Sequence, residues 1–457
     1  MKILSIVEIG DWNDKKFKFR YMSAVKVALL GLGTIGTGVA DILLNRVERI
    51  RNVTGRDVLL TRICDKDASL KRDIEIPSGV LTNDPELIFN DPDIKIGIEL
   101  IGGIEPARAF VLRLLASGKN VVTANKALLA QHGAELFAAA RQNGCTIAFE
   151  AAVCGGIPII SSIATSLQAN TIQSLDAIVN GTSNFILSQM EDGGTSYSYA
   201  VKEAQRLGYA EANPAMDVDG TDAVQKLTIL AQLGFGVDVD WKKVSRMGIE
   251  SVDAIDFKFA KDLGYRIKLL AVANRGDEGL ELHVAPTLVR RDNPLARVHD
   301  VFNAVRVVGD YVGQVFFQGL GAGRKPTASA VVGDVIDTVL GRAKITFDTL
   351  NLWNSNRKVV PIKRTDNFYG KAYLRFDAED RPGVMRDFAA VFGKNNISIA
   401  SMIQHEKNDQ NNNPNKQNAV IILITHEARE GDLLKAIDEL EKIPSIQGKI
   451  IRMRVQD

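Results

Sequence analysis

The sequence predicts an α/β protein in three parts: a doubly wound parallel sheet, a larger α+β region, and a small βαββαβ unit at the C-terminal end. From Val25 a β-rich run turns through glycines into a segment whose apolar residues recur about every 3.6 positions. Strand and helix patterns then alternate up to residue 149, which is typical of a parallel sheet covered on both faces. After residue 370 the patterns follow a strand, helix, strand, strand, helix, strand order.

The first part contains further buried-strand patterns separated by amphipathic helices. The expected strands are 58–63, 94–101, 120–124 and 145–149, and the expected helices are 106–117 and 127–142. We assign residues 23–150 to this domain. A second glycine-rich turn enters another helical pattern, and we expect residues 321–350 to pack back on the first sheet and complete it.

Changes in composition set the other boundaries. Residues 151–320 mix runs such as 174–190 with helical patterns at 198–207 and 221–233, as in an α+β domain. The polar, basic stretch 351–369 is typical of a linker. Residues 1–22 match no periodic pattern, so we expect a disordered leader or a start at Met22 instead.

The last domain, residues 370–457, follows the order of a ferredoxin-like fold. The expected strands are 371–377, 397–404, 419–425 and 449–455, and the expected helices lie near 383–393 and 428–442. The Asn-rich stretch 408–418 lies between the two middle strands, and we interpret it as a long hairpin loop.

Composition excludes several classes of protein. With 457 residues, 46% apolar and 24% charged, the chain is neither disordered nor fibrous. Lys and Arg number 56 against 55 Asp and Glu, a balance that gives no electrostatic reason to expect nucleic acid or an anionic membrane as partner. The three cysteines form no CxxC, which favours a reducing, cytoplasmic location. The expected partners are small molecules and other subunits.

A GxGxxG motif follows the first strand and opens a helix, the context in which this pattern indicates a Rossmann-type dinucleotide site. Its residues are Gly31, Leu32, Gly33, Thr34, Ile35 and Gly36. The first glycine permits the turn, the second lets a pyrophosphate approach the backbone, and the third brings helix and strand together. The amides at the helix N-terminus are left for the phosphates.

The choice between NAD and NADP stays open. Asp65 is the first acidic residue after the second strand, 34 positions beyond Gly31 instead of the usual ~20. Its carboxylate favours a free ribose 2′-hydroxyl. The nearby cations are suited to a 2′-phosphate instead: Arg62, Lys66, Lys71 and Arg72.

Two more segments follow strands of the first sheet at the edge where such sheets bind ligands. Gly102 ends one strand, and Thr123 ends the next and is followed by Lys126. A lysine at this junction is either a solvated surface residue or a group facing nicotinamide or substrate.

The densest functional pattern lies between Gly208 and Lys226. Asp222 and Lys226 are four positions apart, so they share one face of a helix that begins near Thr221. An exposed ion pair is the simpler interpretation. However, four carboxylates lie within twelve residues before and at the start of this helix, and such a cluster needs a cation, either a substrate ammonium or Lys226.

In these segments the chain resembles the homoserine dehydrogenase family. The similar stretches are VNGTSNFIL (179–187), GYAEANPAMDVDGTDAVQKLTILA (208–231), TANKALLA (123–130), EAAVCGGIPII (150–160) and GAGRKPTASAVVGD (321–334). The resemblance implies reversible hydride transfer between NAD(P)H and L-aspartate 4-semialdehyde, which gives L-homoserine for threonine and methionine synthesis. It also implies a nucleotide-binding domain, a substrate-binding and dimerisation domain, a C-terminal ACT domain, and a homodimer or tetramer.

Reduction of an aldehyde needs a proton for the developing alkoxide. We expect Lys226 to be the general acid, with Asp222 orienting it. The resemblance implies that Lys126 approaches both cofactor and substrate, and that Glu211 binds the substrate ammonium with support from Asp217. It further implies contacts from Gly208, Tyr209 and Thr182 to the substrate and from Gly321 and Gly323 to the cofactor.

The resemblance also implies a monovalent cation, expected to be sodium, held by Glu150 and the carbonyls of Val153, Gly155 and Ile157. These ligands are all oxygens, which suit a hard ion or a water cluster equally. In the ACT domain, the turn 380–384 would anchor the carboxylate of a threonine effector, unless the unit only joins subunits.

Two other functions compete with this interpretation. A phosphorylating semialdehyde dehydrogenase would use a cysteine nucleophile, for which Cys154 is the candidate, although we favour a small packed residue. A sensor of nucleotide and amino acid would show no chemistry at all.

Overall fold

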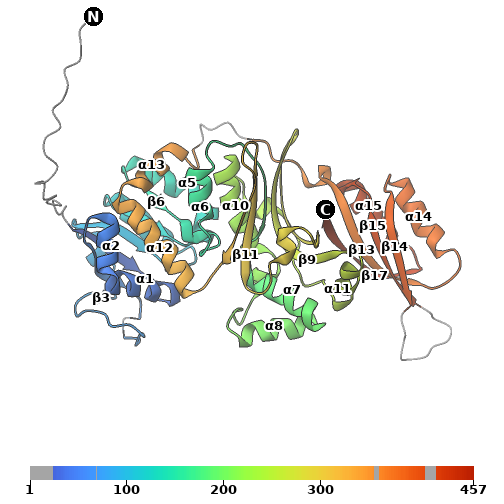
Figure 1. Ribbon diagram of the computed structural model, residues 1–457, viewed down its shortest axis with the longest axis horizontal. Helices are drawn as coiled ribbons and strands as arrows, with labels where there is room; N and C mark the ends of the chain where they lie inside the picture. The colour runs from blue at the N-terminus through green and yellow to red at the C-terminus, as the bar shows by residue number, and fades with distance from the viewer. Residues whose placement is uncertain (1–23, 68, 355–359, 407–417) are drawn as a thin grey trace, which may run out of the picture.

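The computed structural model describes residues 24–67, 69–354, 360–406 and 418–457. The expected leader and most of the Asn-rich stretch lie outside these ranges. The described chain forms an elongated molecule with the part that contains α1 and α2 and the C-terminal unit at opposite ends of a central sheet (Figure 1). Among the described residues, no helix is both long and apolar enough to pass through a bilayer.

The first sheet is parallel throughout, with strand order β3-β2-β1-β4-β5-β6. Its strands are β1 (Val25–Leu30), β2 (Val58–Cys64), β3 (Leu81–Thr82), β4 (Ile94–Glu99), β5 (Asn120–Thr123) and β6 (Ile147–Ala148). The helices are α1 (Thr34–Asn45), α2 (Val47–Thr54), α3 (Glu86–Phe89), α4 (Ala107–Ala116) and α5 (Lys126–Gln142). The doubly wound order predicted from the alternating patterns is confirmed.

Two later helices, α12 (Arg324–Val339) and α13 (Arg342–Leu350), return to this sheet. Helix α12 packs so closely on α1 that a Cβ at Gly38 would lie 2.9 Å from Cγ of Arg324. Beyond α13, the ring of Trp353 packs against Phe137 with centroids 4.5 Å apart, so the first residues of the expected linker belong to the core.

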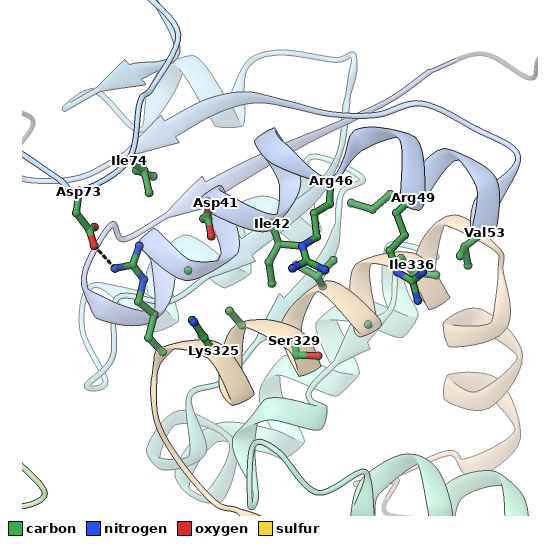
Figure 2. Close-up of a pocket in the computed structure, with 16 residues that line it drawn as sticks. Asp41, Ile42, Arg46, Arg49, Val53, Asp73, Ile74, Lys325, Ser329 and Ile336 are labelled. Carbon is green, nitrogen blue, oxygen red and sulfur yellow. Dashed lines mark hydrogen bonds and ion pairs between the residues drawn. The ribbon is translucent and has the colours of Figure 1, made fainter.

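A groove of about 740 Å³ lies over the α1–α12 contact, and Arg324 bonds Asp73 across one end of it (Figure 2). None of the three motif glycines, Gly31, Gly33 and Gly36, lines this groove. It is therefore separate from the glycine loop that follows β1.

The second sheet has the strand order β12-β11-β7-β9-β10-β17-β13-β15-β14, with short β8 and β16 alongside. Its central strands are β7 (Ile172–Ile178), β8 (Ser245–Arg246), β9 (Tyr265–Gly276), β10 (Gly279–Arg290), β11 (Phe302–Gly309) and β12 (Gly313–Leu320). The associated helices are α6 (Ile159–Ser161), α7 (Gly181–Gly193), α8 (Tyr197–Arg206), α9 (Ala215–Val218), α10 (Thr221–Phe235) and α11 (Ala254–Asp262). Helix α10 is buried on nearly all sides, so its polar residues face protein.

The C-terminal unit has the predicted βαββαβ order. It contains β13 (Tyr369–Glu379), α14 (Val384–Lys394), β14 (Ile399–Glu406), β15 (Asn418–Thr425), β16 (Ala428–Arg429), α15 (Glu430–Leu440) and β17 (Ile446–Gln456). Strands β14 and β15 are antiparallel neighbours, in agreement with the expected hairpin. One feature has no counterpart in the sequence patterns: β17 pairs in parallel with β10, through Thr287 and Arg454, so that one continuous sheet joins both domains.

Candidate active site

The glycine loop has the shape that a dinucleotide needs. Gly31 has a φ of +96°, and a Cβ there would lie 2.6 Å from the carbonyl oxygen of Leu100. A Cβ at Gly36 would lie 2.1 Å from the carbonyl oxygen of Gly31, whereas nothing lies within 4 Å of one at Gly33. Helix α1 begins at Thr34 without a side-chain cap. The loop therefore leaves open space in front of an uncapped helix N-terminus, which fits a pyrophosphate.

Asp65 lies at this loop, but its carboxylate has partners within the protein. Its Oδ2 accepts a hydrogen bond from the amide of Leu32 at 2.6 Å. Arg72 lies 3.4 Å from its Oδ1 and donates through Nε to the carbonyl oxygen of Leu32 at 2.9 Å. Asp65 and Arg72 thus hold the amide and the carbonyl group of Leu32, a role that sequence reasoning missed. Lys66 is exposed.

Glu99 is a further residue that sequence reasoning missed. It is fully buried at the end of β4. Its carboxylate accepts hydrogen bonds from the amides of Ile101 and Gly102 and, at 2.7 Å, from the hydroxyl of Thr123. Glu99 thereby joins the ends of β4 and β5, and the Thr123 hydroxyl is engaged with it. The sequence feature that could have identified Glu99 is its position as a charged residue at the end of an apolar strand pattern.

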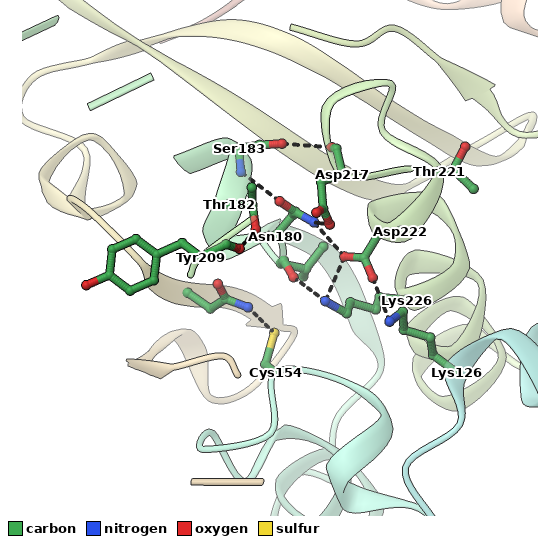
Figure 3. A network of polar contacts seen from close by, with 12 residues as sticks. Lys126, Cys154, Asn180, Thr182, Ser183, Tyr209, Asp217, Thr221, Asp222 and Lys226 are labelled. Atoms are coloured by element: carbon green, nitrogen blue, oxygen red, sulfur yellow. Dashed lines mark hydrogen bonds and ion pairs between the residues drawn. The ribbon is translucent and has the colours of Figure 1, made fainter. Parts of the chain in front are cut away.

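Asp222 is the centre of a buried polar network (Figure 3). Its Oδ2 lies 2.7 Å from Nζ of Lys226, and its Oδ1 lies 3.0 Å from Nζ of Lys126. Lys226 also donates to the carbonyl oxygen of Val179 at 2.7 Å. The side chains of Lys226 and Asp222 are only 11% and 6% exposed, which excludes the exposed ion pair as an interpretation.

Asn180 joins the second carboxylate to this network. Its Nδ2 lies 2.8 Å from Oδ1 of Asp217 and 2.8 Å from Oδ2 of Asp222, while its Oδ1 accepts from the amide of Ser183 and caps α7. Sequence reasoning did not select Asn180, although an asparagine between a buried strand and a helix is a common cap.

The network separates the pKa values of its carboxyl groups. Burial alone would raise the pKa of Asp222, but the ammonium groups of Lys226 and Lys126 hold it well below the usual value. Burial raises the pKa of Asp217, and the neighbouring Asp222 charge adds to that effect. The Asp222 charge in turn raises the pKa of Lys126. Asp222 is thus the fixed negative charge of the site.

The predicted substrate residues border this network from the loop after α8. The hydroxyl of Thr182 donates to the carbonyl oxygen of Tyr209 at 2.7 Å, and the Tyr209 ring packs on Phe185. Gly208 turns the chain with a φ of +75°. Glu211 is exposed and contributes to the raised pKa of Lys126.

Cys154 is buried, at 1% exposure, and its Sγ accepts from Nδ2 of Asn303 at 3.5 Å. Burial raises the pKa of this thiol to about 11. A nucleophile would need the thiolate, so the environment favours the packed-residue interpretation.

Glu150 lies between the two sheets. Its two carboxylate oxygens accept from the amides of Ile160 and Ser161, and its own amide donates to Oδ2 of Asp334 at 2.8 Å. Burial raises the pKa of both carboxyl groups. A cavity of about 550 Å³ adjoins them and is also lined by Gly155 and Ile157. Asp334 was not selected from the sequence.

The second glycine turn lies against this region. The amide of Gly155 donates to the carbonyl oxygen of Gly321 at 2.9 Å. A Cβ at Gly321 would overlap Asn303, and Gly323 precedes α12 with a φ of +110°. The Asn303 side chain thus explains the glycine at position 321, and the positive φ explains the glycine at position 323.

A dinucleotide loop and a buried network of lysines and carboxylates on one chain define a nicotinamide-dependent oxidoreductase. The model described as the NAD-binding domain of homoserine dehydrogenase matches residues 31–150, the homoserine dehydrogenase model matches 158–336, and the ACT domain model matches 372–445. The chain belongs to the homoserine dehydrogenase family.

Named relatives support this assignment over the whole chain. A homoserine dehydrogenase of Synechocystis sp. is 43% identical over 93% of this chain and 97% of its own length, and one of Bacillus subtilis is 38% identical over 93% and 98%. The crystal structure of a homoserine dehydrogenase from Thiobacillus denitrificans matches with a TM-score of 0.86 and 40% identity, over 96% of this chain and 99% of that one. A hyperthermophilic archaeal homoserine dehydrogenase in complex with NADPH matches with a TM-score of 0.59 and 28% identity, over 70% and 98%. The chain is therefore an NAD(P)-dependent enzyme that interconverts L-homoserine and L-aspartate 4-semialdehyde.

Proposed function

We propose that Lys226 transfers the proton in this reaction. An ammonium group has three N–H donors. Within the described residues, two acceptors are bonded to Nζ of Lys226: Asp222 Oδ2 and the carbonyl oxygen of Val179. The third donor is left for the aldehyde oxygen, which takes a proton during reduction. This geometry is the observation that carries the proposal.

Asp222 orients Lys226 through the ion pair between them. Its carboxylate forms ion pairs with Lys226 and Lys126. The negative charge of Asp222 therefore favours the return of a proton to Lys226 after Lys226 has given one up. Lys126 lies at the first turn of α5, at the carboxyl edge of the first sheet, and we assign it to the contact between cofactor and substrate. When bound, the nicotinamide supplies or accepts the hydride.

The substrate ammonium is assigned to the carboxylates that surround the network. Glu211 is exposed on the adjoining loop, and Asp217 is held by Asn180. Gly208, Tyr209 and Thr182 would line the same pocket, since one hydrogen bond ties that loop to the start of α7.

The test is the rate of homoserine-dependent NAD(P)⁺ reduction in Lys226→Ala, with Cys154→Ser as the control. We expect kcat to fall by ~10² or more in Lys226→Ala with little change in cofactor affinity. Cys154→Ser should retain activity without phosphate. Full activity in Lys226→Ala would refute the assignment, and phosphate-dependent activity lost in Cys154→Ser would favour the phosphorylating reaction.

We assign the cation site to Glu150 and the carbonyls of Val153, Gly155 and Ile157, with Asp334 as an additional charge. Two buried carboxyl groups with raised pKa values support this, because a cation beside them would relieve their repulsion. Sodium is the expected ion.

We also assign residues 23–150 with 321–350 to nucleotide binding, 151–320 to substrate binding and dimerisation, and 370–457 to regulation by threonine. Support for a homo-oligomer comes from β14, an edge strand that leaves one side for another copy. Three buried free cysteines fit a cytoplasmic location. Light scattering of the purified chain tests the oligomer, and initial rates with added threonine test the effector.

A further inference from the structure

Glu99 ends β4 as a fully buried carboxylate, in a strand whose other buried side chains are apolar: Ile94, Ile96 and Ile98. Its backbone pairs with Thr123 of β5, so the two strands are joined there without any side-chain charge. Taking a carboxylate out of water is costly, and an apolar residue in place of a buried charge is often neutral or stabilising. The charge of Glu99 therefore needs an explanation other than the stability of the sheet.

This carboxylate closes a ring of hydrogen bonds between two loops. Its Oε1 accepts from the amides of Ile101 and Gly102 at 2.8 and 3.2 Å. Its Oε2 accepts from the hydroxyl of Thr123 at 2.7 Å. The Thr123 oxygen in turn accepts from the amide of Asn125 at 3.0 Å, and Nδ2 of Asn125 donates to the carbonyl oxygen of Gly103 at 2.7 Å. The ring thus begins and ends on the loop that follows β4.

The ring determines which groups this loop can offer to a ligand. A planar trans peptide holds its N–H and C=O in opposite directions. Because the amide of Gly102 points at Glu99, the carbonyl oxygen of Ile101 points away from Glu99. The carbonyl oxygen of Leu100 lies against the glycine loop, since a Cβ at Gly31 would lie 2.6 Å from it. Glu99 therefore withholds the two amide donors that a phosphate would need, and the loop presents a carbonyl oxygen instead.

The same ring sets the start of α5, which carries Lys126. Asn125 caps this helix, because its Oδ1 accepts from the amide of Leu128 at 3.1 Å. Lys126 is the next residue, and its Nζ lies 3.0 Å from Oδ1 of Asp222 (Figure 3). The direction in which the Lys126 side chain leaves the helix depends on the backbone at Asn125, which the ring holds.

We propose that Glu99 is a positioning residue for hydride transfer. Its hydrogen-bond ring holds the loop after β4 and the N-terminus of α5 as one unit, so that the cofactor edge of the first sheet and Lys126 keep a fixed relative position. Reacting groups need such a fixed geometry, because a displacement of ~1 Å costs up to ~10²-fold in rate. The expected effect on kcat rests on the proposed role of Lys126, whereas the effect on cofactor affinity rests on the loop alone.

The experiment compares Glu99→Gln with Glu86→Gln in the full chain. Glu99→Gln keeps the shape but replaces one acceptor oxygen by an NH₂ group, so either the loop or Thr123 loses its acceptor. Glu86→Gln is the matched control in the same domain, because its side chain is 45% exposed in an ion pair. Asn125→Asp tests the other side of the ring, since it keeps the oxygen that caps α5 and removes the donor to the loop.

We expect Glu99→Gln and Asn125→Asp to lower kcat for homoserine oxidation at least tenfold. Both should also raise the dissociation constants of NADPH and NADH, measured by their fluorescence, at least threefold, and Glu86→Gln should match the unmodified enzyme. In combination with Lys126→Ala, Glu99→Gln should lower kcat no further, because the group that it positions is gone. Melting temperatures verify that each variant is folded, and Asn125→Asp decides if Glu99→Gln is not.

Unchanged kcat in Glu99→Gln, with Lys126→Ala impaired, would overturn the proposal. Losses in Glu99→Gln that multiply fully with those of Lys126→Ala would also overturn it, because independent effects on kcat indicate a general change in the structure. Full kcat in Lys126→Ala would instead refute the proposed role of Lys126. The cofactor affinities would then decide on Glu99: weaker binding in Glu99→Gln would support its hold on the loop, and unchanged binding would refute it.

Discussion

Replacing Asn180 by aspartate tests how the active site keeps two carboxylates in place. The amide nitrogen of Asn180 lies 2.8 Å from an oxygen of Asp217 and 2.8 Å from an oxygen of Asp222. Hydrogen bonds to charged groups contribute ~1.5–3 kcal/mol each, so Asn180→Asp removes ~3–6 kcal/mol of stabilisation from this network. Because the new side chain has the same shape, the change is electrostatic.

A third carboxyl group in contact with Asp217 and Asp222 is repelled by them, so its pKa rises and one proton is taken up by the three groups as pH falls. A raised pKa in the folded state means that stability is lost as pH rises through that value. Protonation also restores a donor to the network. We therefore expect kcat/KM to be reduced at least tenfold at pH 8 and to recover toward the unmodified enzyme as pH falls.

The assay is kcat and KM for homoserine oxidation between about pH 5.5 and 9, with melting temperatures over the same range. Asn180→Ala is the control, because it removes the donor without adding a titratable group and should be impaired equally at every pH. A pH profile of Asn180→Asp that runs parallel to that of the unmodified enzyme, at similar rates, would show that Asn180 does not position these carboxylates.

Three further perturbations test the cofactor loop, the cation site and the buried histidine. Gly33→Val should raise the KM for the cofactor at least ~tenfold with an unchanged melting temperature, because a Cβ there meets no protein atom yet projects into the space left for pyrophosphate. Glu150→Gln should abolish any difference between initial rates in sodium chloride and in choline chloride; equal rates of the unmodified enzyme in both salts would argue against the site. Burial, and then the charge of Arg454, lowers the pKa of His283 to about 4 from 6.5, so the unfolded chain takes up that proton first as pH falls. We expect ~3 kcal/mol of stability to be lost between pH 6.5 and 4, measured by urea unfolding, and a smaller loss in His283→Gln.

The spacing of apolar and polar residues predicted the helices that are determined by residues close together in the sequence. The expected helix 106–117 corresponds to Ala107–Ala116, and the expected helix 127–142 to Lys126–Gln142. In both, an amphipathic period and flanking polar residues specify the helix without help from distant segments. The face shared by Asp222 and Lys226 was predictable for the same reason, because a spacing of four residues fixes it.

Most contacts between distant segments were not predictable in this way, and the return of residues 321–350 to the first sheet is the exception. The parallel pairing of β10 with β17 joins residues 287 and 454, and no feature of either strand alone specifies the other. Asp65 illustrates the same limit within the site: its place after β2 indicated a ribose contact, which stays a prediction, but gave no sign that the amide of Leu32 lies within 2.6 Å of its carboxylate. Strand register and packing determine such pairings, and both depend on the complete fold and not on the residues of one segment.

The bridge between Lys126 and Asp222 has a consequence for the reaction as a whole. Lys126 begins α5 in the nucleotide-binding domain, whereas Asp222 belongs to α10 on the other side of the site. Hydride must reach the carbon and the proton must reach the oxygen of one carbonyl group. The proposed role of Lys226 therefore requires a fixed position of Lys226 relative to the cofactor. Since Asp222 also holds Lys226, one carboxylate fixes the proposed general acid and the domain that carries the cofactor at the same time. Lys126→Ala should therefore lower kcat, measured at saturating concentrations of both substrates, while the fold is retained. The reason is that the relative position of the cofactor and Lys226 is lost, and not the affinity for either substrate.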